Sequence, residues 1–164
     1  MSIWRGMGRR LRQDESGVSL LETLIVAPVV MLLGFALIEF GAFLHAKSRV
    51  ETGVRDAARY LGRCADGLGC DAADARNLAV FGNIAGAGPT RVQDWAGADI
   101  VIWTATPGGT WTANAMEDGG AWPDRGDKVR VETDFGYTGS LLLAGLGFAE
   151  LPIVTFHEDV YYGR

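Results

Sequence analysis

The chain has 164 residues, of which 48% are hydrophobic, and carries a formal net charge of −5. This length provides one modest core beyond an N-terminal apolar segment, so a second folded domain is not expected. The acidic balance argues against nucleic-acid binding, because phosphate contacts require an excess of lysine and arginine. With two histidines, no nucleophile elbow, no phosphate loop and no metal-ligand spacing, the sequence indicates neither an enzyme nor a cofactor-binding protein.

An apolar segment covers residues 18–44 and contains only two charged side chains, Glu22 and Glu39. As a helix of about 27 residues it would extend roughly 40 Å, which is enough to cross a bilayer. Four arginines precede the segment, whereas the first basic residue after it is Lys47. Since a short arginine-rich flank stays on the cytoplasmic side during insertion, we expect the N-terminus inside and the residues after about His45 outside.

The start of this segment admits three interpretations. A cleaved secretory signal needs a shorter apolar core and a small-x-small site, whereas the nearest candidate here, Leu44-His45-Ala46, begins with leucine. A simple uncleaved anchor would leave Gly17 as a turn residue and Glu22 in the interfacial zone. The pattern also resembles a type IV pilin signal, which has a short basic leader, a glycine and an apolar helix with glutamate as its fifth residue. Cleavage after Gly17 would make Val18 the first residue and Glu22 the fifth.

The position of Glu22 has a physical consequence. A carboxylate at the edge of a membrane span is costly to insert without a partner, and an unpaired one tends to take up a proton instead. In pilins, as the resemblance implies, this glutamate pairs with the new terminal amine of a neighbouring subunit when the helices pack side by side. Paired in this way, Glu22 would specify the axial register of neighbouring subunits.

A second group of residues narrows the choice among the families that share this signal. Glu22 is followed by Pro28, the span ends in Ile38-Glu39-Phe40-Gly41, and Ala57-Ala58-Arg59-Tyr60 follows on the next helical stretch. This order resembles the TadE-like proteins, the pseudopilins of the tight-adherence (Tad) pilus, over residues 16–62. The chain differs from many of them in having threonine directly after the glutamate and an acidic pair just before the glycine.

The resemblance implies a prepilin peptidase site between Gly17 and Val18, and roles for Pro28 and Glu39 in the shape and exit of the helix. Proline lacks an amide hydrogen and clashes with the preceding turn, so Pro28 should bend or locally open the helix. Glu39 would pair with a basic residue on a partner helix or lie in the headgroup region. The implied partners are other pilin or pseudopilin subunits, the pilus assembly platform, the prepilin peptidase and the inner membrane.

The helix is predicted to continue beyond the membrane and to end at Gly62, because apolar residues recur at helical spacing after the span. These residues are Val50, Val54, Ala57, Ala58 and Leu61. A helix over residues 18–61 would be about 66 Å long. We therefore expect a cytoplasmic leader over residues 1–17, a helix over 18–62 that is transmembrane to about residue 44, and a periplasmic head over 63–164.

Two cysteines, Cys64 and Cys70, follow the helix. In an oxidising periplasm a pair this close in a glycine-containing loop is expected to form a disulfide. A zinc pair is the alternative, although His45 and His157 are distant in sequence and there is no second cysteine pair. The closed loop is short, so we expect the disulfide mainly to fix the turn between the long helix and the head.

The head is predicted to be α+β, with a small antiparallel sheet packed on the outer half of the helix, the pilin-like plan. Short apolar runs separated by glycine, proline and aspartate predict a helix at 71–84 and strands at 100–105, 129–135 and 153–161. A sheet laid on the helix would bury the apolar faces of both. The glycine-rich segment 106–126 is interpreted as a long loop.

Two other patterns have ordinary structural explanations. Arg125-Gly126-Asp127 spells an adhesion tripeptide, but a turn between strands accounts for it. Four tryptophans could form an adhesive patch, although packing in the core and loops is the favoured interpretation. They are Trp95, Trp103, Trp111 and Trp122.

We therefore expect a minor pilin or pseudopilin that takes part in assembly of a Tad-type pilus, held in the bacterial inner membrane by one helix and able to enter an extracellular pilus. One alternative is a bitopic envelope protein whose periplasmic head binds a ligand or surface. Another is a pseudopilin of a type II secretion apparatus, which shares the signal but fits the helix exit less well. A pilin-like subunit needs its helix for function, whereas a binding head should work on another anchor.

Overall fold

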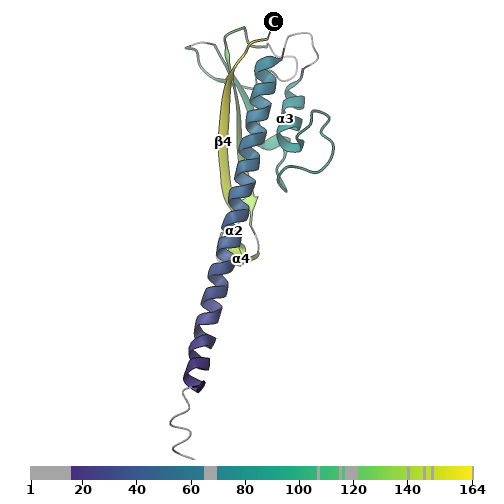
Figure 1. Ribbon diagram of the computed structural model, residues 1–164. Coiled ribbons are helices and arrows are strands. Elements are labelled where there is room, and N and C mark those ends of the chain that lie inside the picture. The colour runs from purple at the N-terminus through teal and green to yellow at the C-terminus, as the bar shows by residue number, and fades with distance from the viewer. Residues whose placement is uncertain are drawn as a thin grey trace, which may run out of the picture. The chain divides into compact units, whose positions relative to one another are not determined.

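The structure is a computed structural model, and it describes residues 16–64, 70–106, 108–114, 116, 122–139, 141–145, 147–148 and 150–163 (Figure 1). The acidic pair before Gly17 and the other leader residues up to 15 lie outside these described residues. The chain divides into two compact units, Met1–Gly41 and Ala42–Arg164.

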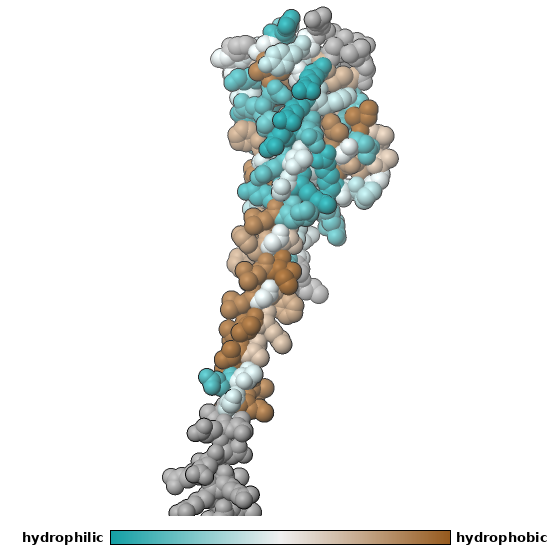
Figure 2. Space-filling model, in the orientation of Figure 1, coloured by the Kyte–Doolittle hydropathy of each residue, from teal (hydrophilic) through white to brown (hydrophobic). Residues whose placement is uncertain are grey.

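The first element described is the 48-residue helix α2, Ser16–Arg63. The predicted helix is confirmed, and it passes through Pro28 as one element. In the first unit its apolar side chains are exposed, which gives this part of the surface its hydrophobic character (Figure 2). The helix is long and apolar enough there to cross a membrane.

In the second unit the inward side of α2 forms the centre of the core. The five apolar residues predicted to recur at helical spacing are all completely buried, and Ala46 is nearly so. This side of α2 packs against the helix α3, Ala72–Phe81. The Asp71 side chain caps α3 by accepting a hydrogen bond from the Ala73 amide at 3.2 Å. Gly82 ends it in the left-handed conformation, at φ 77°, so α3 stops before the predicted residue 84.

The second contact partner of α2 is a four-stranded antiparallel sheet with strand order β2-β1-β3-β4. The short elements are the 3-10 helix η1 (Gly97–Asp99) and the helix α4 (Leu141–Gly145); the strands are β1 (Ile100–Ala105), β2 (Thr112–Ala113), β3 (Lys128–Thr138) and β4 (Glu150–Val160). All three predicted strands and the α+β class are confirmed. Strand β2 was not predicted, because its two residues lie in the glycine-rich segment interpreted as loop.

Alternation along β3 separates the two faces of the sheet. Val129, Val131, Thr133 and Phe135 are buried on the face that joins the core, whereas the residues between them are partly or fully exposed. We call the second face the outer sheet face. Strand β3 pairs with β4 over its whole length, from Lys128 opposite Val160 to Thr138 opposite Glu150.

Trp95 connects the three layers of this unit. Its side chain is 1% exposed, and its indole Nε1 donates a hydrogen bond to Thr133 Oγ1 at 3.1 Å. The Thr133 hydroxyl in turn donates to the Asp99 carbonyl oxygen at 2.9 Å. Both polar groups are therefore satisfied inside the core, where an unpaired one would be destabilising.

Gly53 lets α2 approach this tryptophan closely. A methyl group at Gly53 would lie 2.5 Å from the Ala79 carbonyl oxygen and 2.8 Å from the Trp95 ring. Those distances are too short for real atoms, and one of the obstacles is backbone of α3. A glycine is required at this position because the helix backbones could not otherwise approach as they do.

Gly53→Ala should therefore lower the free energy of unfolding by about 1–3 kcal/mol, because the added methyl must displace α3 or Trp95. The measurement is denaturant unfolding of the full chain in detergent micelles, followed by tryptophan fluorescence. Gly41→Ala on the same helix is the matched control, since a methyl there meets nothing within 4 Å. Equal stability of the two variants would contradict the packing role of Gly53.

The end of α2 is held by a disulfide and by the C-terminal end of the sheet. Cys64 and Cys70 form a disulfide with a Cα–Cα distance of 6.0 Å, as predicted. Beside them the Tyr162 amide donates to the Gly62 carbonyl oxygen at 2.7 Å. The disulfide thus lies where the last turn of α2 meets the residues that follow β4.

Cys64→Ala combined with Cys70→Ala should lower the free energy of unfolding by about 2 kcal/mol, because a closed loop this short removes little entropy from the unfolded chain. Denaturant midpoints of the oxidised protein, the reduced protein and the double variant provide the measurement. The reduced protein is expected to match the variant. An unchanged midpoint in both would show that the disulfide has no stabilising role.

Candidate functional site

The proposed processing site lies at the beginning of α2. Gly17 and Val18 are in its first turn, since the helix begins at Ser16. Gly17 is exposed, and a methyl group there would meet nothing within 4 Å. No packing contact of the described chain therefore requires glycine at position 17, in contrast to Gly53.

Glu22 lies one turn further along α2, with its side chain exposed. It borders a shallow groove of about 460 Å³ on the helix surface. The groove is lined by Ser19, Glu22, Thr23, Val26, Ala27, Val30 and Met31. The Thr23 hydroxyl donates to the Ser19 carbonyl oxygen at 2.9 Å, so it needs no further acceptor in an apolar environment.

This groove combines a carboxylate with small side chains. Ser19, Thr23 and Ala27 are spaced four residues apart, so they lie on one face of the helix. Small side chains at this spacing let a second helix approach closely in a membrane. None of the basic side chains that the structure describes forms an ion pair with Glu22. The arrangement can therefore accept a neighbouring helix together with a cation.

Pro28 and Glu39, the other two sequence-predicted residues of the helix, are not among the residues that line this groove. Because Pro28 has no amide hydrogen, the Leu24 carbonyl oxygen loses its usual helical donor. The Glu39 side chain is partly exposed and makes an interaction within the chain. Bending at Pro28 and pairing of Glu39 with a partner helix stay predictions.

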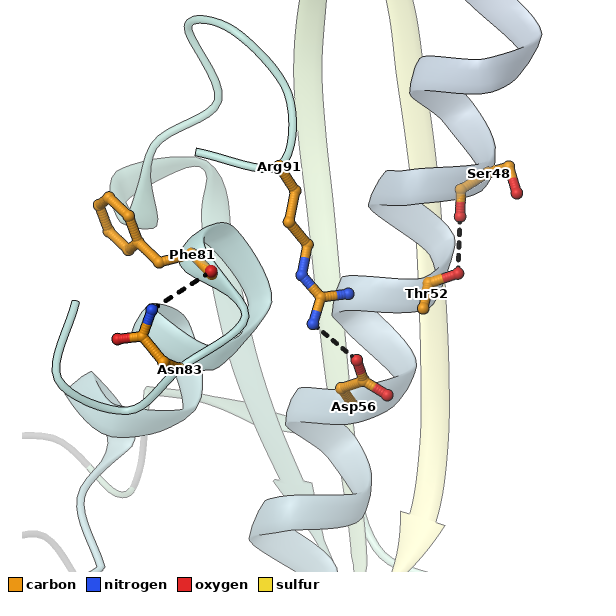
Figure 3. A network of polar contacts seen from close by, with 6 residues as sticks. All are labelled: Ser48, Thr52, Asp56, Phe81, Asn83 and Arg91. Atoms are coloured by element: carbon orange, nitrogen blue, oxygen red, sulfur yellow. Dashed lines mark hydrogen bonds and ion pairs between the residues drawn. The ribbon is translucent and has the colours of Figure 1, made fainter. Parts of the chain in front are cut away.

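A polar network that the sequence did not predict fixes α2 in the second unit. Arg91 pairs with Asp56 of α2 at 2.8 Å (Figure 3). The Arg49 guanidinium of α2 donates to the Arg91 carbonyl oxygen at 2.9 Å. In the same view Asn83 donates to the Phe81 carbonyl oxygen at 3.3 Å. Asp56 and Arg91 are 35 residues apart, so no local pattern could reveal the pair.

A second hollow, of about 450 Å³, lies beside the disulfide. It is lined by Asp56, Arg59, Tyr60, Arg63, Cys64, Cys70 and Leu78. The Tyr60 hydroxyl donates to the Asp74 carboxylate at 3.3 Å. Burial, followed by the negative charge of Asp74, raises the pKa of Tyr60 above its usual range. Tyr60 therefore remains a neutral donor near neutral pH, and it joins α2 to α3.

The four tryptophans do not form one patch. Trp95 is in the core, and Trp122 packs against Tyr161 with a ring-centroid distance of 6.2 Å. Trp103 and Trp111 belong to the outer sheet face, where the Arg130 guanidinium lies 4.2 Å from the Trp111 ring centroid. Trp103, Trp111 and Trp122 are all partly buried, so none of the four is presented as a fully exposed side chain, in agreement with the packing interpretation.

The adhesion-like tripeptide is a turn, as predicted. Gly126 has φ 99°, and Asp127 is buried, with its carboxylate accepting a hydrogen bond from the Asp124 amide at 2.8 Å. A carboxylate used in this way is not presented to a receptor. Among the residues that the structure describes, no group of three histidine, cysteine or acidic side chains is placed to hold a metal ion.

The fold and the site define a class of protein with one N-terminal helix able to span a membrane, a carboxylate on that helix, and an α+β C-terminal unit. The family model described as TadE-like protein matches residues 17–59, so the resemblance is confirmed over the segment that carries Gly17, Glu22, Pro28 and Glu39. The match makes this segment similar to TadE-like proteins, and the residues after 59 lie outside it. Comparisons with curated proteins and with solved structures gave no match.

Proposed function

We propose that the chain is a minor pilin or pseudopilin that takes part in assembly of a Tad-type pilus, with Glu22 setting the register of neighbouring helices. The observation that carries the proposal is an exposed carboxylate on an apolar helix, five residues after Gly17, inside the segment that matches the TadE-like family. A carboxylate in that setting needs a cation from another molecule, because an unpaired charge is destabilised in an apolar environment.

Cleavage after Gly17 would create such a cation. The new α-amino group of Val18 would be positively charged at neutral pH and would lie at the end of the helix. On a neighbouring helix shifted by about one turn, it comes level with Glu22, which is four residues further along. The groove of small residues beside Glu22 supports the close approach that this pairing requires.

The proposed orientation puts the leader in the cytoplasm and the second unit in the periplasm. The arginines before the apolar segment support the first part, because positive flanks stay on the cytoplasmic side. The disulfide Cys64–Cys70 supports the second, because disulfides persist in oxidising compartments. The prepilin peptidase, other pilin subunits and the assembly platform are then the partners of the chain at the inner membrane.

Expression with a cognate prepilin peptidase should yield a new N-terminus at Val18, and expression without it should leave Met1 in place. Intact mass and N-terminal sequencing are the measurements. Gly17→Val should block the cleavage without unfolding the chain, since Cβ at position 17 meets open space. Gly34→Val is the matched control, because that glycine also has open space and lies far from the site. An uncleaved wild type would leave the simple-anchor interpretation standing.

Glu22→Ala should leave membrane insertion intact and abolish co-purification with partner pilins, because the terminal amine of the neighbour loses its counter-charge. Glu22→Gln should behave similarly, since it keeps the shape and removes the charge. Thr23→Ala serves as the control on the same groove and should retain assembly. Normal pilus formation by both Glu22 variants would exclude a role of this residue in register.

A further inference from the structure

Three arginines form a continuous basic row on α2 in the second unit. Arg55, Arg59 and Arg63 are all exposed, and each is four residues from the next. We call this row the arginine ridge. Successive residues at this spacing are about 6 Å apart along the helix. The ridge lies on the side of α2 opposite Val50, Val54 and Leu61, which are buried against the sheet and α3.

The ridge has no described counter-charge within the chain. The acidic residues nearest in sequence are otherwise placed, since Asp56 pairs with Arg91 and Glu51 lies 3.9 Å from Lys47. Among the ion pairs between described residues, none involves an arginine of the ridge. Hydrophilic residues dominate the face of this unit on which α2 lies in front (Figure 2).

The outer sheet face carries the complementary feature. Glu132 and Asp134 of β3 are both directed to this face, about 7 Å apart along the strand. Their register partners on β4 are Phe156 and Val154, whose side chains are 57% and 56% exposed. Two carboxylates therefore border an exposed apolar patch, and no described basic side chain pairs with either of them.

The outer sheet face already holds one guanidinium of the chain between an aromatic ring and a carboxylate. Arg130 lies 4.8 Å from the Phe156 ring centroid, and its Nε donates to Glu158 at 2.9 Å. An aromatic ring with a neighbouring carboxylate is a favourable site for arginine, since the planar group can stack and donate at once. Glu132 and Asp134 offer the same kind of setting beside the remaining surface of Phe156 and Val154.

The charge of the second unit is divided between α2 and the residues that follow it. Residues 42–63 contain five basic and two acidic side chains, whereas residues 64–164 contain six basic and 14 acidic ones. The α2 segment of one copy and the acidic residues that follow it in another, Glu132 and Asp134 among them, are thus of opposite charge, which favours encounter between copies. Two copies brought together by the same surface would instead place like charges opposite each other.

We propose that the arginine ridge of one copy docks on the outer sheet face of a second copy of this chain, with arginines opposite Glu132 and Asp134 and their stems over Phe156 and Val154. The two surfaces lie on opposite sides of the second unit, because α2 packs on the other face of the sheet (Figure 1). Such a contact joins unlike surfaces and repeats from copy to copy. This contact extends the proposed function. It rests on that function in one respect, which is that packing of the membrane helices brings the second units of neighbouring copies side by side.

A zero-length crosslink tests the contact directly. Arg59→Lys keeps the positive charge of the ridge and supplies an amine that a carbodiimide can join to a carboxylate in contact. Unlabelled and ¹⁵N-labelled full-length chains carrying this substitution are mixed in liposomes, crosslinked and digested. Mass spectrometry should find position 59 joined to Glu132 or Asp134 in peptides of mixed isotopic label. Absence of mixed-label crosslinks at these carboxylates would overturn the proposal.

Charge reversal tests the same contact by affinity. Arg55→Glu with Arg59→Glu, and separately Glu132→Arg with Asp134→Arg, should each weaken self-association in liposomes at least about tenfold, because attraction becomes repulsion. Energy transfer between two C-terminally labelled populations is the readout. A mixture of the two variants should recover association, since the reversed ridge then meets the reversed sheet. Failure of the mixture to recover would overturn pairing between these two surfaces.

A matched control and a second background separate this contact from Glu22. Arg125→Glu changes an exposed basic residue away from both surfaces and should leave self-association within about twofold of wild type. In a Glu22→Ala background the crosslink at position 59 should persist. If instead association depends on Glu22 and not on the ridge, the docking is wrong and the proposed function stands. In liposomes that also contain a partner pilin, ridge crosslinks to that subunit alone would likewise overturn docking of a second copy.

Discussion

The constraint on which the structure depends is that one helix, α2, has to satisfy two different environments along its length. Its first part presents apolar side chains on all sides, and such side chains are stable only in lipid or against other apolar helices. Its second part buries one side and exposes the other, as the helix of a water-exposed α+β unit must. The change occurs within a few residues after Gly41, without a break in the helix.

The sheet, α3 and the disulfide follow from the second environment. A helix with one buried side needs a matching apolar surface, and the alternating residues of β3 provide it. Gly53 and Trp95 then set how closely α3 can approach α2. The Asp56–Arg91 pair and the disulfide hold the segments on either side of this contact. None of the described side chains of the first unit is buried, so the stability of this part of α2 depends on the membrane or on partner helices.

Local patterns were sufficient to predict most of the elements. The long helix, the three main strands, the second helix and the disulfide each have a signal that lies within a short stretch of sequence, such as the alternation of Val129, Val131 and Thr133. The contacts between elements could not be predicted in this way. The Trp95–Thr133 hydrogen bond joins residues 38 apart, and Gly53 is required by the backbone of a helix that follows it. Strand β2 was missed because two residues carry no periodicity.

The glycines of α2 fall into two groups. Packing within the fold requires glycine at some positions and does not require it at others. At Gly53 the surrounding atoms account for the residue completely, and at Gly62 a methyl would press against the Val160 carbonyl oxygen at 3.0 Å. At Gly17, Gly34 and Gly41 a methyl meets open space, although glycine is unfavourable inside a helix. Glu22 belongs with this second group, because its charge has no described partner within the chain.

Under the proposed function, contacts with other molecules account for the exposed glycines of α2 and for Glu22. A peptidase can need a residue without a side chain, a neighbouring helix can need a close approach, and a terminal amine can need a counter-charge. Under the proposed function, the first part of α2 is specified by intermolecular contacts, whereas the second part is specified by its own core.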